Sequence, residues 1–140
     1  MGFREKLAWA MMVIMAGTGG LYYSWVHMQS SAIGAWAPPN IAFLIGYVVL
    51  VIVLAIVAGI AIGISRPSEA SPPMDERERL ILFAGEVWAG RLLSVLILCT
   101  LLDFAVSGNG NRLFHLVFAS LIISQVGEYV FRIFFYRRGV

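Results

Sequence analysis

Two long apolar runs of the sequence each contain an acidic and a basic residue four or five positions apart: Glu86 and Arg91 in the first, Glu128 and Arg132 in the second. Ionised side chains within an apolar helix usually face other helices and pair with opposite charges, and they often mark proton or ion pathways. These four residues are therefore the first candidates for chemistry. They indicate either a proton or ion relay or a polar pocket, or else a static ion-pair clamp between two helices.

The spacing of these residues predicts how they pair. If the two runs form helices that turn back on each other, residues whose numbers sum to about 219 lie at equal depth, which pairs Arg91 with Glu128 and Glu86 with Arg132. Glu128 and Arg132 are four residues apart and share one helix face. Glu86 and Arg91 are separated by about 140° around their helix axis, so they do not point at the same neighbour.

Two uncharged polar residues are predicted to extend this cluster by hydrogen bonds between helices. Gln125 lies about one helical turn from Glu128, and Ser94 lies at a similar depth in the other run. The predicted polar cluster therefore consists of Glu86, Arg91, Ser94, Gln125, Glu128 and Arg132.

The composition determines the medium in which these residues act. Hydrophobic residues make up 60% of the 140 residues and charged residues 13%, whereas soluble domains contain about 45–50% apolar and roughly 25% charged residues. A water-soluble domain is excluded. The formal net charge of +2 comes from basic residues that flank apolar runs, which favours membrane orientation over nucleic-acid binding. The predicted surroundings are a lipid bilayer.

Four apolar runs are long enough to cross a bilayer, since a crossing helix needs about 20 apolar residues. Their apolarity is continuous rather than alternating, which predicts helices and not the strands of a barrel. We therefore expect an all-α membrane protein, a single domain over residues 1–140 with four transmembrane helices arranged as two antiparallel hairpins. The expected helices are 7–28, 41–64, 80–106 and 113–136, and the linker is 65–79.

The positions of lysine and arginine predict the orientation. With four crossings, seven basic residues fall on one side, whereas the loops on the other side contain one arginine. Short basic loops stay in the cytoplasm, so we expect both termini on the cytoplasmic side of a bacterial inner (plasma) membrane. The seven residues are Arg4, Lys6, Arg66, Arg77, Arg79, Arg137 and Arg138.

A charged segment precedes the third expected helix, and we call it the platform: Asp75, Glu76, Arg77, Glu78 and Arg79. Asp75 is a suitable N-cap residue, and Glu78, three residues later, would complete a capping box. From Asp75 to Val106 the helix would be about 48 Å long. This exceeds the bilayer core, so the platform is expected to reach the cytoplasm, where a partner protein has access to it.

Small residues follow one another at intervals of four in the second expected helix, at Ala55, Gly59 and Gly63. In lipid, such a strip allows two helix backbones to approach closely. It predicts a helix contact, either within the chain or between copies in a homo-oligomer.

The two histidines, His27 and His115, both map to the outer side. They are either interfacial polar residues or a ligand pair for a haem b, which would make the chain a haem- or quinone-binding redox subunit. Nearby, Asp103 and Arg112 are expected to form a salt bridge across a turn. The sequence has no nucleophile with a base, no zinc-protease motif and no phosphate-binding loop, so we expect no enzyme, no catalytic residues and no metal site.

Several segments resemble a group of uncharacterised bacterial four-helix inner-membrane proteins, from the opening Phe3-Arg4-Glu5-Lys6 to the YRRG-type ending at 136–140. The DERER-type segment 75–81 and the segment 113–119 carry the rest of the resemblance. Members of such families are often encoded beside small helix-turn-helix regulators, so the resemblance implies a cytoplasmic regulator as partner. It implies no activity and no catalytic residues.

Three functions follow as alternatives. The first is a non-enzymatic accessory, regulatory or partner-binding protein, alone or within a larger membrane complex. The second is a small proton-coupled transporter or channel that uses Glu86 and Glu128. The third is the redox subunit that would use His27 and His115.

Overall fold

A computed structural model describes residues 3–65 and 75–138, and these residues form four helices and no strand. The helices are α1 (Phe3–Ile33), α2 (Ile41–Ser65), α4 (Glu76–Ser107) and α5 (Gly110–Arg138). The helices α1, α4 and α5 begin before and end after their apolar runs, because polar residues at both ends continue the helical turns. Of the expected linker, residues 66–74 lie outside the described residues.

Three of the helices, α2, α4 and α5, are long and apolar enough to cross a membrane. The expectation that the first helix would also qualify is not met, although α1 contains 31 residues. Its apolar run is interrupted by the segment 17–20, Gly-Thr-Gly-Gly, and by Tyr22 and Tyr23. These residues contribute little hydropathy.

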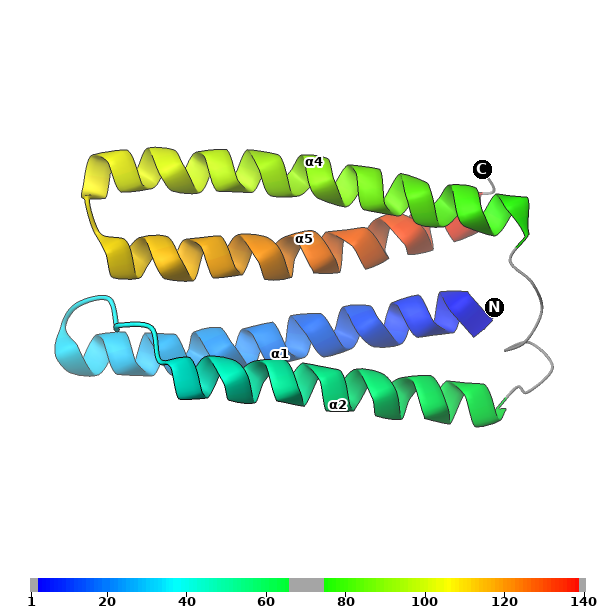
Figure 1. Ribbon diagram of the computed structural model, residues 1–140, viewed down its shortest axis with the longest axis horizontal. Coiled ribbons are helices and arrows are strands. Elements are labelled where there is room, and N and C mark those ends of the chain that lie inside the picture. The colour runs from blue at the N-terminus through cyan, green and yellow to red at the C-terminus, as the bar shows by residue number, and fades with distance from the viewer. Residues whose placement is uncertain (1–2, 66–74, 139–140) are drawn as a thin grey trace.

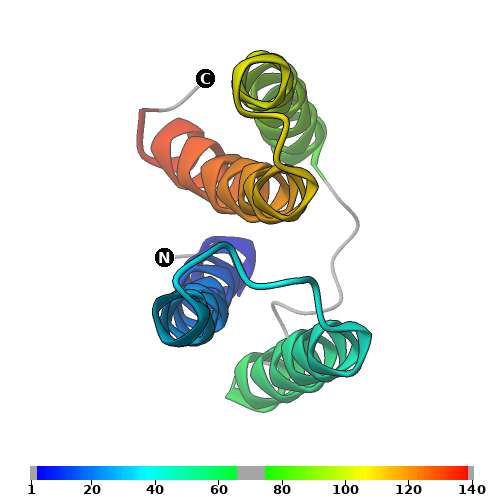
Figure 2. The ribbon, with the colours of Figure 1, turned by 90° about the vertical axis from the view of Figure 1, so that its left-hand side faces the viewer.

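The helices alternate in direction along one long axis (Figure 1). The beginnings of α1 and α4 and the ends of α2 and α5 therefore lie together, at what we call the charged end. The connections 34–40 and 108–109 lie at the opposite end, which we call the connection end. Seen from that end, α5 and α1 lie between α4 and α2 (Figure 2). The extensive contacts are α4 with α5, α5 with α1, and α1 with α2.

The contact between α4 and α5 follows the predicted register. The rings of Trp88 and Phe131 lie 5.9 Å apart, and the hydroxyls of Thr100 and Ser120 lie 3.4 Å apart. In both pairs the residue numbers sum to about 219, which is the sum predicted for residues at equal depth in the two helices. Side chains from the two helices therefore meet at the depths that the sequence predicted.

The helix α1 is, with α5, one of the two interior helices of the bundle (Figure 2). Its residues Thr18, Gly19, Tyr22 and Val26 are buried, whereas α2 has no buried residue. Gly19 lies so close to α5 that a Cβ atom there would be 2.8 Å from Cγ2 of Ile122. The helix α1 contacts α5 and α2. Thr18, Gly19 and Tyr22, which make α1 less apolar, are therefore buried within the bundle.

Local residue choices explain where α4 begins and ends. Asp75 is the N-cap, and its carboxylate accepts a hydrogen bond of 2.7 Å from the backbone N–H of Glu76, which confirms the predicted cap. Gly108 follows the helix with a φ of 62°, and its N–H donates to the Phe104 carbonyl at 2.8 Å. Glu78 binds a residue of α1 instead of completing the capping box.

The two neighbouring glycines of α1 provide a test of this packing. Gly19→Ala should lower the free energy of unfolding by about 1–3 kcal/mol, because the branched Ile122 side chain cannot move aside without strain. Gly20→Ala should have no such cost, since a Cβ there meets nothing within 4 Å. Thermal unfolding in detergent, followed by circular dichroism, measures both. Equal midpoints would contradict the close contact between α1 and α5.

Candidate functional site

Arg132 is the centre of the charged cluster between α4 and α5. Its Nη2 atom lies 3.5 Å from Oε1 of Glu86 and contacts Oε1 of Glu128 directly. The side chains of Arg132 and Glu128 are 18% and 13% exposed, whereas that of Glu86 is 62% exposed. Gly85 leaves room for the arginine, because a Cβ at this position would lie 2.7 Å from Cγ of Arg132. One cation therefore holds two carboxylates from two helices.

Arg91 does not take part in this cluster. It is exposed, and its Cζ atom lies 5.0 Å from the centre of the Trp88 ring. It makes no ion pair within residues 3–65 and 75–138, so the predicted pairing with Glu128 is wrong. The reason is angular: Arg91 has the predicted depth, but it lies about 140° around the helix from Glu86, which faces Arg132.

The two uncharged polar residues predicted for the cluster also lie elsewhere. Ser94 is exposed and donates to the Gly90 carbonyl of its own helix at 2.9 Å, and Gln125 is exposed. The buried residue is Ser124, whose hydroxyl donates to the Ala89 carbonyl at 3.0 Å. One residue changes the direction of a side chain by about 100°, and Ser124 shares its helix face with Glu128.

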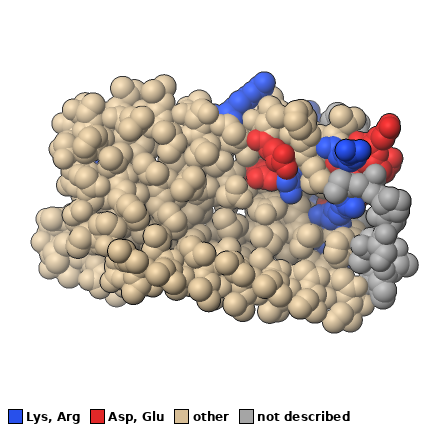
Figure 3. Space-filling model, in the orientation of Figure 1, with Lys and Arg blue, Asp and Glu red and all other residues tan. Residues whose placement is uncertain are grey.

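Two further ion pairs link helices at the charged end. Nε of Arg4 lies 3.3 Å from Oε2 of Glu78, which joins α1 to α4. Nε of Arg137 lies 3.8 Å from Oε1 of Glu5, which joins α5 to α1. On the face that Figure 3 shows, acidic and basic side chains gather in the half toward this end. The other platform residues, Asp75, Glu76, Arg77 and Arg79, are exposed.

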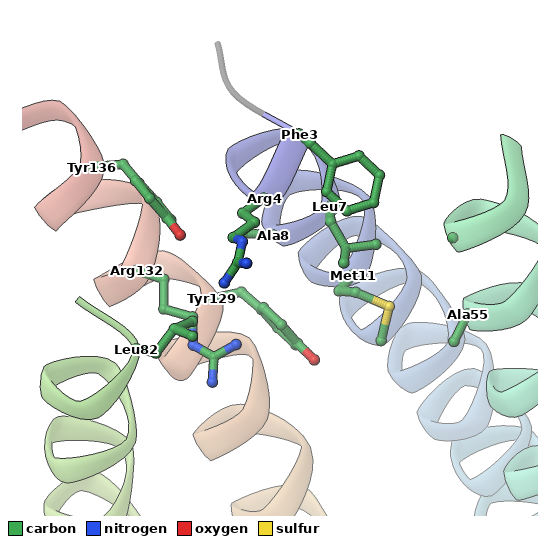
Figure 4. A pocket seen from close by; sticks show the side chains of 11 residues that line it. Phe3, Arg4, Leu7, Ala8, Met11, Ala55, Leu82, Tyr129, Arg132 and Tyr136 are labelled. Atoms are coloured by element: carbon green, nitrogen blue, oxygen red, sulfur yellow. The ribbon is translucent and has the colours of Figure 1, made fainter. Parts of the chain in front are cut away.

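A cavity of about 490 Å³ opens among the four helices near the charged end (Figure 4). Ligand pockets in proteins typically have volumes of about 300–1,000 Å³. The polar side chains come from α1 and α5, and apolar side chains from α1, α2 and α4 face them. The lining residues are Phe3, Arg4, Leu7, Ala8, Met11, Ala55, Gly59, Leu82, Tyr129, Arg132 and Tyr136.

A second, polar hollow of about 300 Å³ lies beside the platform. Asp75, Arg77 and Glu78 line it, and so do Arg4 and Tyr136, which also line the larger cavity. Arg4 and Tyr136 therefore separate the cavity among the helices from the hollow at the platform.

The predicted strip of small residues forms part of the cavity wall. Ala55 and Gly59 line it, and a Cβ added at Gly59 or Gly63 would meet nothing within 4 Å. Within the described chain, the two glycines therefore make no close helix contact, and this half of the prediction is wrong. Contact between copies in a homo-oligomer stays a prediction.

His115 lies at the connection end and is fully buried. Its Nε2–H donates to the Ala37 carbonyl at 3.0 Å, so its Nδ1 is the acceptor for the Tyr22 hydroxyl at 3.2 Å. These bonds join the connection 34–40, α1 and α5. The expected Asp103–Arg112 salt bridge lies at the same end and is confirmed, at 2.6 Å.

The histidine pair proposed as haem ligands has an unfavourable arrangement. Both ring nitrogens of His115 are occupied by hydrogen bonds, and His27 is exposed. No group of three His, Cys, Asp or Glu side chains that could hold a metal ion occurs in the described part of the chain. Haem ligation by His115 would require one of its two ring nitrogens to give up its hydrogen bond.

Sequence reasoning missed the cavity and the residues that border it, Arg4 and Tyr136. Opposite charges at helix ends that must lie on one side of the bundle were a usable signal, since they included Arg4 with Glu78 and Glu5 with Arg137. Nothing in the residue pattern indicated that Gly59 would face an open space.

Comparison of the chain with protein-family models, with curated proteins and with solved structures finds no match.

The arrangement of the charged cluster predicts which arginine supports the helix pair. Arg132→Gln should lower the free energy of unfolding by about 3 kcal/mol, because it leaves a partly buried carboxylate without its cation. Arg91→Gln should change it by less than about 0.5 kcal/mol, as surface substitutions do. Denaturant titration in mixed micelles measures both values. A larger loss for Arg91→Gln would contradict the assignment of Arg132 as the central residue.

The contacts of His115 predict the stability of the connection 34–40. His115→Ala should speed chymotrypsin cleavage after Trp36 roughly tenfold, because it removes two buried hydrogen bonds that together oppose local opening. His27→Ala is the matched control and should leave the cleavage rate unchanged, since His27 is exposed. Equal rates in the two variants would show that His115 does not hold the connection.

Proposed function

We propose that the chain is a multi-pass membrane protein that crosses the bilayer four times as two antiparallel hairpins, with both ends in the cytoplasm. The apolar surfaces of α2, α4 and α5 support this topology. The position of α1 between α5 and α2 supports a fourth crossing, because Thr18, Gly19 and Tyr22, which lower its hydropathy, are buried within the bundle. The basic residues of the charged end support the orientation.

We further propose that the protein is a non-enzymatic accessory or sensor protein. In this proposal the cavity at the inner end binds a ligand, and the platform reports its presence to a cytoplasmic partner. The observation that carries the proposal is the position of Arg4, which lines the cavity and lies 3.3 Å from Glu78 of the platform. This role requires that the cavity binds a ligand, and it requires no chemical reaction.

Coupling between the cavity and the platform requires only that the ligand binds with different affinity when Arg4 is paired with Glu78 and when it is not. A ligand shifts an equilibrium between two states by this difference in affinity. A ligand that attracts or displaces the Arg4 side chain weakens its pair with Glu78. Such pairs contribute about 0.2–1 kcal/mol when partly exposed. The first turn of α4 is then free to change its contacts.

The resemblance of segments 3–6 and 75–81 to bacterial inner-membrane proteins supports the location and the partner in this proposal. The partner is a cytoplasmic regulator that binds the exposed platform side chains Asp75, Glu76, Arg77 and Arg79.

Filling the cavity should imitate a bound ligand. In Gly59→Leu the new side chain extends into the open space of the cavity that Arg4 also lines, and it restricts the positions that the Arg4 side chain can take there. We expect amide hydrogen exchange in the first two turns of α4 to become about two- to fivefold faster, as the loss of an ion pair worth about 0.5–1 kcal/mol would cause. Mass spectrometry of peptides covering residues 75–82 measures this.

Gly46→Leu is the matched control, because it adds the same side chain to the same helix outside this cavity, where a Cβ also meets nothing within 4 Å. Glu78→Gln should reproduce the faster exchange without filling the cavity. If Glu78→Gln speeds exchange and Gly59→Leu does not, the cavity and the platform are not coupled, and the sensor proposal fails.

A further inference from the structure

The charged groups that line the cavity are all cationic. Arg4 and Arg132 belong to its wall, whereas the carboxylates that pair with them, those of Glu78, Glu86 and Glu128, do not. A ligand in the cavity therefore meets two guanidinium groups and no carboxylate in the wall. An anionic group is favoured at this position.

Two polar atoms of lining residues lack a hydrogen-bond partner. The Tyr136 hydroxyl and the Nε–H of Arg132 are buried, and neither is bonded to any of the residues that the structure describes. Both are donors, and a buried donor without an acceptor is costly. In Figure 4 the Tyr136 hydroxyl and the Arg4 guanidinium are turned toward the same space. A ligand that brings acceptor oxygens to this space would satisfy the Tyr136 hydroxyl, whereas the Nε–H of Arg132 lies against Gly85 of α4.

The rest of the wall is apolar and continues away from the charged end. From Arg4 to Met11 the wall extends about 10 Å along α1, and Leu7, Ala55 and Leu82 complete it. Ala55 and Gly59 have small side chains, so α2 leaves space instead of filling it. A free inorganic anion would gain nothing from these groups, whereas a hydrocarbon chain would bury its surface against them.

We propose that the cavity binds one anionic lipid from the inner leaflet. Its phosphate accepts hydrogen bonds from Arg4, Arg132 and Tyr136, and one acyl chain lies along Leu7, Met11 and Ala55. Basic pockets between transmembrane helices on the cytoplasmic side are known to suit anionic headgroups. The inference rests on the proposed function, because it names the ligand of the same cavity.

The test uses the full chain, delipidated in detergent and titrated with dioleoyl-phosphatidylglycerol or dioleoyl-phosphatidylcholine, with bound lipid counted by native mass spectrometry. The two lipids have the same acyl chains and differ in net charge. The phosphatidylglycerol should bind roughly tenfold more tightly, the difference expected for a hydrogen-bonded charge.

Tyr136→Phe removes one donor and should weaken phosphatidylglycerol binding about five- to tenfold. Tyr47→Phe is its control, because the Tyr47 hydroxyl is also buried without a partner but lies outside this cavity. Gly59→Leu should abolish binding by filling the space, and Gly46→Leu should preserve it. Tyr136→Phe keeps the test decisive if Gly59→Leu does not fold.

Three results would overturn the inference: equal affinity for the two lipids, phosphatidylglycerol binding that survives Tyr136→Phe and Gly59→Leu, or displacement of the lipid by inorganic phosphate at matched ionic strength. The last would show that a soluble anion is the ligand. The hydrogen-exchange experiment with Gly59→Leu tests the coupling of the cavity to the platform, and it needs no added lipid. A failed lipid titration with intact exchange coupling would therefore remove the ligand class alone and leave the sensor function in place.

Discussion

A cation buried between two apolar helices has to be neutralised, and Arg132 meets this constraint with carboxylates from both helices of the pair. Glu128 comes from the preceding turn of α5, and Glu86 comes from α4. Because removing one partner of a buried ion pair is strongly destabilising, this contact restricts how far α4 can slide along α5. The same register brings Trp88 to Phe131 and Thr100 to Ser120. The wall of the cavity depends on it too, since it fixes the depth of Arg132.

The depth of these residues followed from the sequence, but their direction did not. Counting from the turn placed Glu86 level with Arg132, and these two side chains meet. The same count placed Arg91 level with Glu128, yet Arg91 lies over Trp88. Depth changes by only about 1.5 Å per residue, whereas direction changes by about 100°. An error of one residue in a predicted position therefore hardly changes the predicted depth, but it changes which side chain contacts the neighbouring helix. Ser124, and not the predicted Gln125, makes such a contact.

The helices themselves were easier to predict than their order of packing. Long apolar runs indicated all four helices, and Asp75 marked the beginning of α4. The sequence did carry a signal for the interior position of α1, because glycine and tyrosine residues interrupt its apolar run. Without knowledge of the neighbouring helices, this interruption indicates only that the helix is less hydropathic. Gly19 and Tyr22 contact α5, and the same residues lower the apolarity of α1. The cavity had no signal, because an empty space depends on three-dimensional packing of residues from all four helices.

Different kinds of interaction hold α1 to its neighbours at the two ends of the bundle. At the connection end, hydrogen bonds to the fully buried His115 join α1, α5 and the connection 34–40. At the charged end, the links between α1 and its neighbours are partly exposed ion pairs. Dissolved ions screen exposed charges and leave buried dipoles unaffected. Rising ionic strength therefore weakens the links of α1 at the charged end and spares its hydrogen bonds at the connection end.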